Sequence, residues 1–357
     1  MSSSDGALRL LYVGPYNSPH VEDLALAMHE RGHVVQAGGE AWSGLPPSSL
    51  PEHGVPTSTM TFPSLLWMRR LLRHFRPDVV HAHWLPFAAQ AALVGARPLV
   101  ATAWGSDVFG ATGRARLWIR LALLRSALVT ADSAALLERL EEVRPKGRKM
   151  LVNWGVDLEA FRVPAEHERS ELKQRLGLGA GPVILSPRGL KELYNPAVVV
   201  EAFERVRGSF PDAQLVLKHG SAEELRPEWN GAPGVRAMGR VEPAVMADLF
   251  RAAEITVSIP VSDSSPRSVW EAMASGSATV LSDLPWVHEL IVDARDALVV
   301  DAEPGAVAAA VERLLEDEAL RERIVRSARG LVERHRNRDV ELARLEESYR
   351  DLARSRR

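Results

Sequence analysis

The chain has 357 residues, of which 46% are hydrophobic and 25% are charged, and its formal net charge is −2. This length is too great for one ordinary core and suits two α/β domains of a globular protein. So small a net charge favours neither nucleic acid nor an acidic polymer as a partner. Because there is no cysteine, disulfides, thiolate catalysis and cysteine metal ligands are excluded.

The N-terminal segment, MSSSDGALRLLYVG, lacks a basic stretch followed by a long apolar run. No apolar run elsewhere is long enough to cross a bilayer, so we expect a cytoplasmic protein. Arginine outnumbers lysine by 39 to 5, which is typical of a GC-rich bacterial genome.

Short apolar runs alternate with helical patterns along the first half of the chain. Strands are predicted at residues 8–13, 34–37, 78–81, 99–102, 128–131 and 150–152, and a helix at residues 21–31. The pattern restarts near residue 182, with strands predicted at residues 182–186, 214–218, 235–238, 255–259, 278–281 and 298–300 and a helix at residues 196–207. Runs that are apolar on both faces and separated by helices indicate parallel sheets covered on both sides.

Two Rossmann-like parallel-sheet domains that face each other across a crevice are therefore predicted, at residues 1–161 and 162–338. Residues 161–181, polar and then rich in glycine, are interpreted as an interdomain segment, and residues 339–357 as a charged amphipathic helix. Ligands of such sheets bind beyond the carboxyl ends of the strands. Polar residues follow the predicted strands at 14–17, 81–84, 104–107, 188–191, 218–220 and 263–271.

The segment at residues 263–271 is the most informative of these. Ser265 is a suitable N-cap and Pro266 a suitable first helical residue. Free amides in the first turn, which favour an anion, would then belong to Arg267, Ser268 and Val269. Glu271, one turn further, could accept hydrogen bonds from a ribose diol, and Asp263 from sugar hydroxyls. An ordinary capped helix with two solvated acids is the alternative.

This segment resembles the signature of retaining GT-B glycosyltransferases, especially glycosyltransferase family 4, in which two glutamates separated by seven residues flank a turn. Other segments extend the resemblance over nearly the whole chain: Arg-Gly-His-Val at 31–34, Val-Asn-Trp-Gly-Val-Asp at 152–157 with Phe161, Gly-Arg-Val at 239–241, and Leu-Phe-Arg-Ala-Ala at 249–253. The resemblance implies the GT-B fold, with the helix at 339–357 crossing back to the N-terminal domain.

The implied reaction is transfer of a hexosyl group from a UDP- or GDP-sugar to a hydroxyl acceptor, with retention of the anomeric configuration. The acceptor class is a small molecule, a glycan or a lipid-linked glycan. Stabilisation of the departing phosphate would supply most of the catalysis, without a cofactor or metal. A nucleotide-sugar epimerase or hydrolase on this fold, and a non-catalytic nucleotide-sugar-binding homologue, are the alternatives.

The resemblance also implies roles for single residues. Glu271 would bind the donor ribose, Asp263 the transferred sugar and Arg188 the diphosphate, which the amides around Ser268 and Val269 would cap. Gly239 and Arg240 would lie near the base, and the loop that begins at Gly14 would face donor and acceptor. Asp263, Arg188 and Asp107 are the predicted catalytic residues, and the predicted acceptor side consists of Tyr16, Asn17, His83 and Trp104.

Three residues depart from the family pattern. The first acid is Asp263 instead of glutamate, and Trp104 stands where a histidine often precedes Gly105. The second basic residue expected after Arg188 is absent, because Leu193 and Tyr194 occupy its places. The candidates for this second cation are Lys191, slightly favoured, Lys218 and Arg267.

Two further features have alternative interpretations. His81 and His83 share a face of their strand and could bind a metal, but a buried, hydrogen-bonded imidazole is favoured, with His83 facing the crevice. Asp107 either contacts acceptor or sugar or caps the turn that follows it.

Basic residues of the N-terminal domain cluster at residues 65–76 and 114–125. In the first cluster one side is apolar and the opposite side carries Arg69, Arg70, Arg73 and Arg76. A core-facing helix with a solvated basic side is favoured. The alternative is a membrane-surface helix that gives weak peripheral contact with the inner membrane face.

Overall fold

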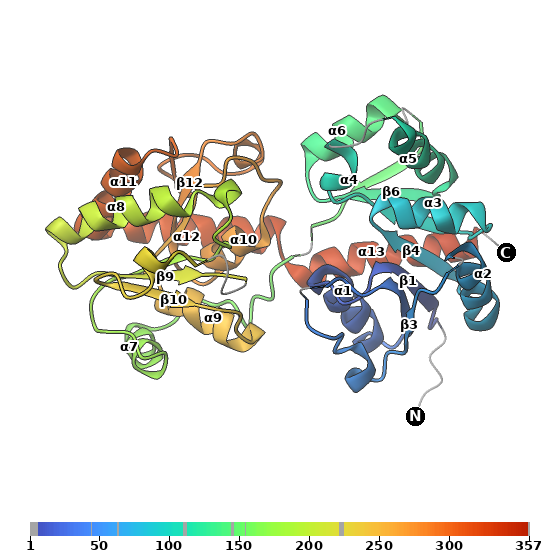
Figure 1. Cartoon of the computed structure of the whole chain (residues 1–357), viewed down its shortest axis with the longest axis horizontal. Helices are drawn as coiled ribbons and strands as arrows, with labels where there is room; N and C mark the ends of the chain where they lie inside the picture. Colours follow the sequence, from blue (N-terminus) through green and yellow to red (C-terminus); the bar gives the residue numbers. More distant parts are fainter. Residues whose placement is uncertain are drawn as a thin grey trace. The chain divides into compact units, whose positions relative to one another are not determined.

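The structure, a computed structural model, describes residues 6–43, 45–62, 64–109, 113–143, 146–153, 155–220 and 225–355. The chain divides into two compact units. Unit 1 comprises Met1–Trp154 with Asp339–Arg357, and unit 2 comprises Gly155–Arg338. Each unit has its own sheet, and every strand pair in the described residues is parallel, which confirms the predicted fold class (Figure 1).

The sheet of unit 1 has the strand order β3-β2-β1-β4-β5-β6-β7 in the part of the chain that the structure describes. Its strands are β1 (Arg9–Pro15), β2 (Val34–Glu40), β3 (Thr57–Thr59), β4 (Val79–His83), β5 (Leu99–Thr102), β6 (Leu128–Ala131) and β7 (Arg148–Leu151). The strand order changes direction between β1 and β4, so the loops after these two strands diverge at the carboxyl edge.

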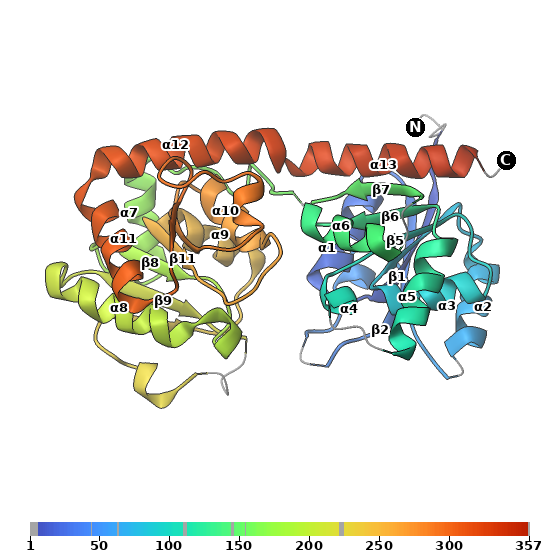
Figure 2. The ribbon, with the colours of Figure 1, turned by 90° about the horizontal axis from the view of Figure 1, so that it is seen from above.

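Helices cover both faces of this sheet. One face carries α2 (Ser64–Phe75), α3 (Leu85–Leu93), α5 (Arg114–Arg125) and α6 (Ala134–Val143), and α4 (Ser106–Phe109) follows β5. The other face carries α1 (Pro19–Glu30) and the C-terminal α13 (Arg338–Arg354), which lies along the sheet (Figure 2).

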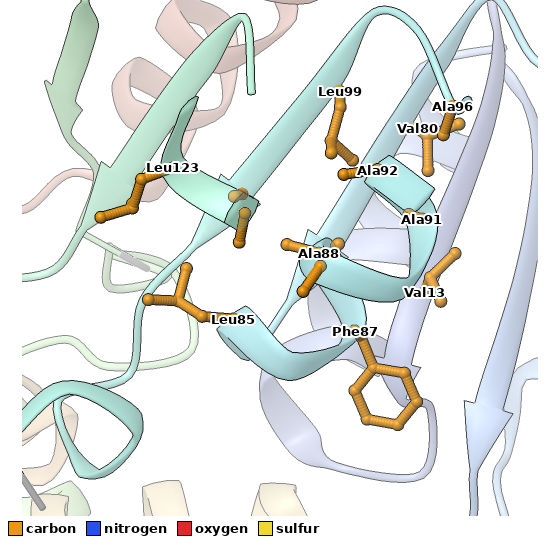
Figure 3. Close-up of a cluster of buried hydrophobic side chains, with 14 of the residues drawn as sticks. Val13, Val80, Leu85, Phe87, Ala88, Ala91, Ala92, Ala96, Leu99 and Leu123 are labelled. Atoms are coloured by element: carbon orange, nitrogen blue, oxygen red, sulfur yellow. The ribbon is translucent and has the colours of Figure 1, made fainter. Parts of the chain in front are cut away.

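The alanines of α3 bring this helix close to the sheet. Ala88, Ala91 and Ala92 are buried beside Val13 and Val80, and the larger buried side chains of the helix, Leu85 and Phe87, lie near its start (Figure 3). Small residues on a buried helix face permit such an approach because no bulky side chain separates helix and sheet. The position of α3 in turn fixes the loop between β4 and α3 at the carboxyl edge.

The sheet of unit 2 has the order β10-β9-β8-β11-β12-β13 within the described residues. Its strands are β8 (Val183–Ser186), β9 (Gln214–Lys218), β10 (Val235–Met238), β11 (Ile255–Ser258), β12 (Ala278–Ser282) and β13 (Leu298–Val300). One face is covered by α7 (Glu166–Arg175), α9 (Pro243–Ala252) and α10 (Arg267–Ala274), the other by α8 (Pro196–Ser209) and α11 (Pro304–Glu316). The long α12 (Glu318–His335) contributes to both cores.

The predicted strands are present, with ends that differ by up to three residues, and β3 is an additional strand. The interpretation of residues 161–181 as an interdomain segment is wrong, because they contain α7, which packs in unit 2. Lys173 of α7 forms an ion pair of 2.6 Å with Glu254. Residues 155–161 also belong to unit 2, where Val156 and Phe161 are buried.

None of the helices described in the structure is both long enough and apolar enough to span a membrane.

Candidate functional site

The candidate donor site lies at the carboxyl edge of the sheet of unit 2, where the strand order reverses between β8 and β11. The loops that follow these strands are tied together by two hydrogen bonds. The backbone amide of Val261 donates to the carbonyl of Leu193 (2.9 Å), and Nδ2 of the Asn195 side chain donates to the carbonyl of Ile259 (2.9 Å). The next element after the second loop is α10. The predicted site segments at residues 188–191 and 263–271 therefore meet at this edge.

Arg188 connects these segments. Its guanidinium forms an ion pair of 2.7 Å with Asp263, and both side chains are largely buried, at 18% and 15% exposed. Its Nη1 donates to Ser268 Oγ at 3.4 Å, and the ring of Tyr194 lies 4.6 Å beneath the guanidinium carbon. The structure thus brings together the residues predicted to contact the diphosphate and the transferred sugar.

The start of α10 differs from the prediction by one residue. Pro266, not Ser265, is the N-cap, and the first helical residue is Arg267. The predicted cap is wrong because Ser265 has a left-handed conformation (φ 55°) and its hydroxyl accepts a hydrogen bond from the Trp270 indole (3.0 Å). Since the amide of Val269 donates to the carbonyl of Pro266, the first two amides of the helix are those of Arg267 and Ser268.

Glu271 lies one turn into α10 and is 12% exposed. Its Oε1 forms an ion pair of 2.7 Å with Nε of Arg267, four residues earlier on the same helix. This pairing holds the carboxylate on the side of α10 that carries the first helical residue.

The two candidate lysines have different environments. Lys218 is buried at the end of β9 and donates to the carbonyl of Met238 (3.3 Å) and to that of Gly239. Burial, and to a smaller extent Arg240, lowers the pKa of Lys218 to about 8. Lys191, which the sequence slightly favours, is exposed in the loop after β8.

The loop after β1 in unit 1 is held by its own side chains. The buried Tyr16 hydroxyl contacts Thr59 Oγ1 at 2.8 Å. The buried Asn17 amide donates to the carbonyls of Trp42 and Pro46 (3.1 Å each) and accepts from the amide of Trp42 (2.8 Å). The side chains of Tyr16 and Asn17 therefore fix the loop, and Gly14 lies against His83, whose carbonyl would be 2.8 Å from an added β-carbon.

The two histidines of β4 are buried. Nδ1 of His81 lies 2.5 Å from the Tyr349 hydroxyl and Nε2 lies 2.6 Å from Thr102 Oγ1, and burial lowers the pKa of His81 to about 3. His83, predicted to face the crevice, is instead fully buried, with its ring centroid 4.3 Å from that of His81. Burial holds the pKa of His83 well below its usual range. No group of three possible metal ligands occurs among the described residues.

Trp104 lies in an aromatic cluster that the sequence did not predict. Its ring makes edge contacts with His20 (5.4 Å) and Trp42 (5.7 Å), and Trp42 contacts Trp84 (6.1 Å). These residues follow different strands or begin α1, so no spacing within one segment could show that they meet. Trp84 has φ 72°, an unusual conformation for a residue with a side chain.

Asp107 holds two loops of unit 1 together. It is buried and accepts hydrogen bonds from the amide of Trp104 (3.0 Å) and from that of Leu85 (2.8 Å), the first residue of α3. Burial raises its pKa, although these hydrogen bonds oppose the shift. It therefore fixes the start of α3 and the loop after β5 at the same edge.

Both units match known protein families. Residues 18–160 match the family model described as Glycosyltransferase Family 4, and residues 181–317 match that described as Glycosyl transferases group 1. The fold is that of a structure of Anabaena HepE with UDP and glucose (TM-score 0.79, 17% identity, 97% of this chain and 100% of that chain). A sucrose-phosphate synthase from Thermosynechococcus elongatus has the same fold (TM-score 0.76, 16% identity, 97% of this chain and 99% of that chain).

Among relatives in sequence is a phosphatidyl-myo-inositol mannosyltransferase of Mycobacterium tuberculosis, 27% identical over 345 residues that cover 88% of each chain. A D-inositol 3-phosphate glycosyltransferase of an Arthrobacter strain is 30% identical over 185 residues, 49% of this chain and 43% of the relative. The two parallel-sheet units and these matches define a glycosyltransferase of the GT-B type. The chain belongs to the GT-B glycosyltransferases, with a family 4 domain followed by a group 1 domain.

Proposed function

We propose that this enzyme transfers a hexosyl group from a nucleoside-diphosphate sugar, UDP- or GDP-linked, to a hydroxyl acceptor with retention of the anomeric configuration. The observation that carries the proposal is the position of Arg188 between Asp263 and Ser268, at the point where the strand order of unit 2 reverses. A cation next to the first turn of a helix is suited to a diphosphate.

The diphosphate would bind Arg188 and the amides at the start of α10. Arg267 and Ser268 supply the first two amides, which point out of the helix with its positive dipole end. The cation and the dipole would stabilise the negative charge that develops as the sugar–phosphate bond breaks. The departing phosphate would accept the proton of the acceptor hydroxyl, so no protein base and no metal are required.

The sugar and ribose would bind the two carboxylates. A carboxylate can accept several hydrogen bonds, so each could bind hydroxyls beside its observed partners, which include Arg267 for Glu271, and the Ser264 amide and Arg188 for Asp263. We assign the ribose diol to Glu271 and hydroxyls of the transferred sugar to Asp263. Gly239 and Arg240 would lie near the base.

The acceptor would bind at the carboxyl edge of unit 1. Trp104 is half-buried there among other aromatic rings, and Asp107 fixes its loop. Two relatives are named for inositol-containing acceptors, which favours a ring polyol as acceptor class. We also propose that the protein is cytoplasmic and makes weak contact with the inner membrane face through basic residues of unit 1.

The test is a transfer assay with UDP- and GDP-hexoses and myo-inositol or inositol phosphate as acceptor. NMR coupling constants of the product give the anomeric configuration, which should equal that of the donor. An inverted product would contradict retention. Free sugar alone would indicate a hydrolase, an altered nucleotide sugar an epimerase, and nucleotide binding without any product a non-catalytic homologue.

A further inference from the structure

A hollow of about 590 Å³ lies in unit 1, where β4 and β5 begin. Four arginines line it: Arg69 and Arg73 of α2, Arg76 just after α2, and Arg97 just before β5. We call this hollow the arginine pocket. Its remaining lining is mainly apolar, with Leu72, Val80, Val94, Ala96 and Ala353.

The arginine pocket is rich in unbalanced positive charge. In the ranges of the chain that the structure describes, none of its four guanidinium groups has a carboxylate within ion-pair distance. The one acidic residue of the lining is Asp78, and its carboxylate accepts the backbone amide of Arg9 at 2.8 Å. Some arginines elsewhere in unit 1 are paired, such as Arg31 and Arg350, which both contact Glu346.

The local structure concentrates these charges. Arg69 and Arg73 are one turn apart and so lie on the same side of α2, a helix without an acidic residue. Arg76 has φ 50°, a left-handed conformation that non-glycine residues adopt rarely, and it turns the chain from α2 towards β4. Like charges this close repel one another, so the cluster favours occupation by an anion.

The arginine pocket is separate from the acceptor edge proposed above. It lies at the amino end of β4, whereas His83 is at the carboxyl end of the same strand. Four steps of about 3.3 Å along the strand separate Val79 from His83, which is about 13 Å. A ligand in the pocket would therefore not occupy the loops that follow the strands.

We propose that the arginine pocket binds a phosphate ester. Guanidinium groups match phosphate oxygens with paired hydrogen bonds, and the apolar floor suits the organic part of an ester. The ester is either a soluble molecule or the headgroup of an anionic phospholipid, since both present the same phosphate chemistry. Binding there requires no sugar transfer, so it can be tested independently of the proposed function.

The test compares two variants of the full chain that lose the same charge. The pocket variant is Arg73→Gln with Arg97→Gln. The matched control is Arg70→Gln with Arg125→Gln, exposed arginines of unit 1 that do not line the pocket. Calorimetry at low ionic strength measures binding of glycerol 3-phosphate, and sedimentation measures binding to phosphatidylcholine vesicles with and without phosphatidylglycerol.

We expect the pocket variant to bind at least one probe about tenfold or more weakly than the native chain, and the control to change by less than about threefold. Loss of glycerol 3-phosphate binding identifies a soluble ester. Loss confined to phosphatidylglycerol vesicles identifies a lipid headgroup. Equal weakening of both variants would show diffuse charge attraction and overturn the proposal, as would a native chain that binds neither probe.

Discussion

Replacement of Arg188 by alanine should lower kcat/KM at least a hundredfold. The guanidinium lies 2.7 Å from Asp263 and 3.4 Å from Ser268, so alanine removes the positive charge between the carboxylate and the start of α10. A hundredfold loss corresponds to about 2.7 kcal/mol of transition-state stabilisation. One hydrogen bond to a charged group contributes about 1.5–3 kcal/mol, and Arg188 can offer two to a diphosphate.

The same substitution should also lower the stability of unit 2, and this effect must be separated from the effect on the rate. The ion pair with Asp263 is largely buried, and loss of one partner of a fully buried pair costs about 3–5 kcal/mol, an upper bound at these exposures. Loss of the contact with the Tyr194 ring adds about 0.5–1 kcal/mol. Arg226→Ala is the control, because it removes a similar stacking contact, 4.8 Å from the ring of Trp229, by a residue that is not among the candidate site residues.

Initial rates at saturating acceptor, together with thermal melting of both variants, measure the two effects separately. Near-native kcat/KM in Arg188→Ala would refute the role of this residue. A comparable loss of kcat/KM in Arg226→Ala would also refute this role, because it would show that general destabilisation of unit 2 causes the loss.

Four further outcomes are expected. Glu271→Ala should weaken binding of free nucleoside diphosphate about tenfold, and Asp263→Ala should impair transfer without this loss, as calorimetry and rate measurements will show. Chelation and dialysis should leave the rate unchanged, and a loss restored only by magnesium or manganese would contradict metal independence. Lys218→Ala should lower kcat/KM at least about tenfold and Lys191→Ala less than about twofold, because only Lys218 is buried at the end of a strand. A larger loss in Lys191→Ala than in Lys218→Ala would assign the second cation to Lys191. Burial lowers the pKa of His81 from 6.5 to about 3, so between these pH values the unfolded chain binds a proton that the folded chain excludes. The melting temperature should therefore fall as the pH falls from 6.5 to about 3, and a constant melting temperature would contradict this.

The sheets could be predicted because their strands are apolar on both faces. The ends at Leu128–Ala131 and Gln214–Lys218 agree with the prediction to the residue. The strand Thr57–Thr59 was missed because it is short and polar, at the edge of the sheet. The sequence of α7 predicts a linker because it has almost no apolar face, although Leu172 and Lys173 are buried in the structure.

The sequence could predict which residues belong to the candidate site but not how they contact one another. Sequence placed Arg188, Asp263 and Glu271 after strands or on a helix, and two of them meet in an ion pair that no local pattern reveals. The sequence misplaces the cap of α10 because a side-chain hydrogen bond, from the Trp270 indole to the Ser265 hydroxyl, accompanies a left-handed backbone at Ser265 that intrinsic preference disfavours. The burial of His83 could not be predicted either, because it depends on a residue of another strand, Tyr12 of β1, whose ring centroid lies 5.9 Å away.

Two contacts take the place of the basic residue that the family pattern has after Arg188. Where the family pattern has a basic residue, Tyr194 stacks under Arg188, and the carbonyl of Leu193 accepts the amide of Val261 from the loop after β11. These contacts add no charge, but they restrict the rotamers of the one guanidinium and tie its loop to the loop that carries Asp263. A cation held in place stabilises developing phosphate charge without the cost of ordering it during the reaction. In the proposed donor site, this departure would therefore improve the orientation of Arg188, while the buried Lys218, at the end of another strand, would supply the second positive charge.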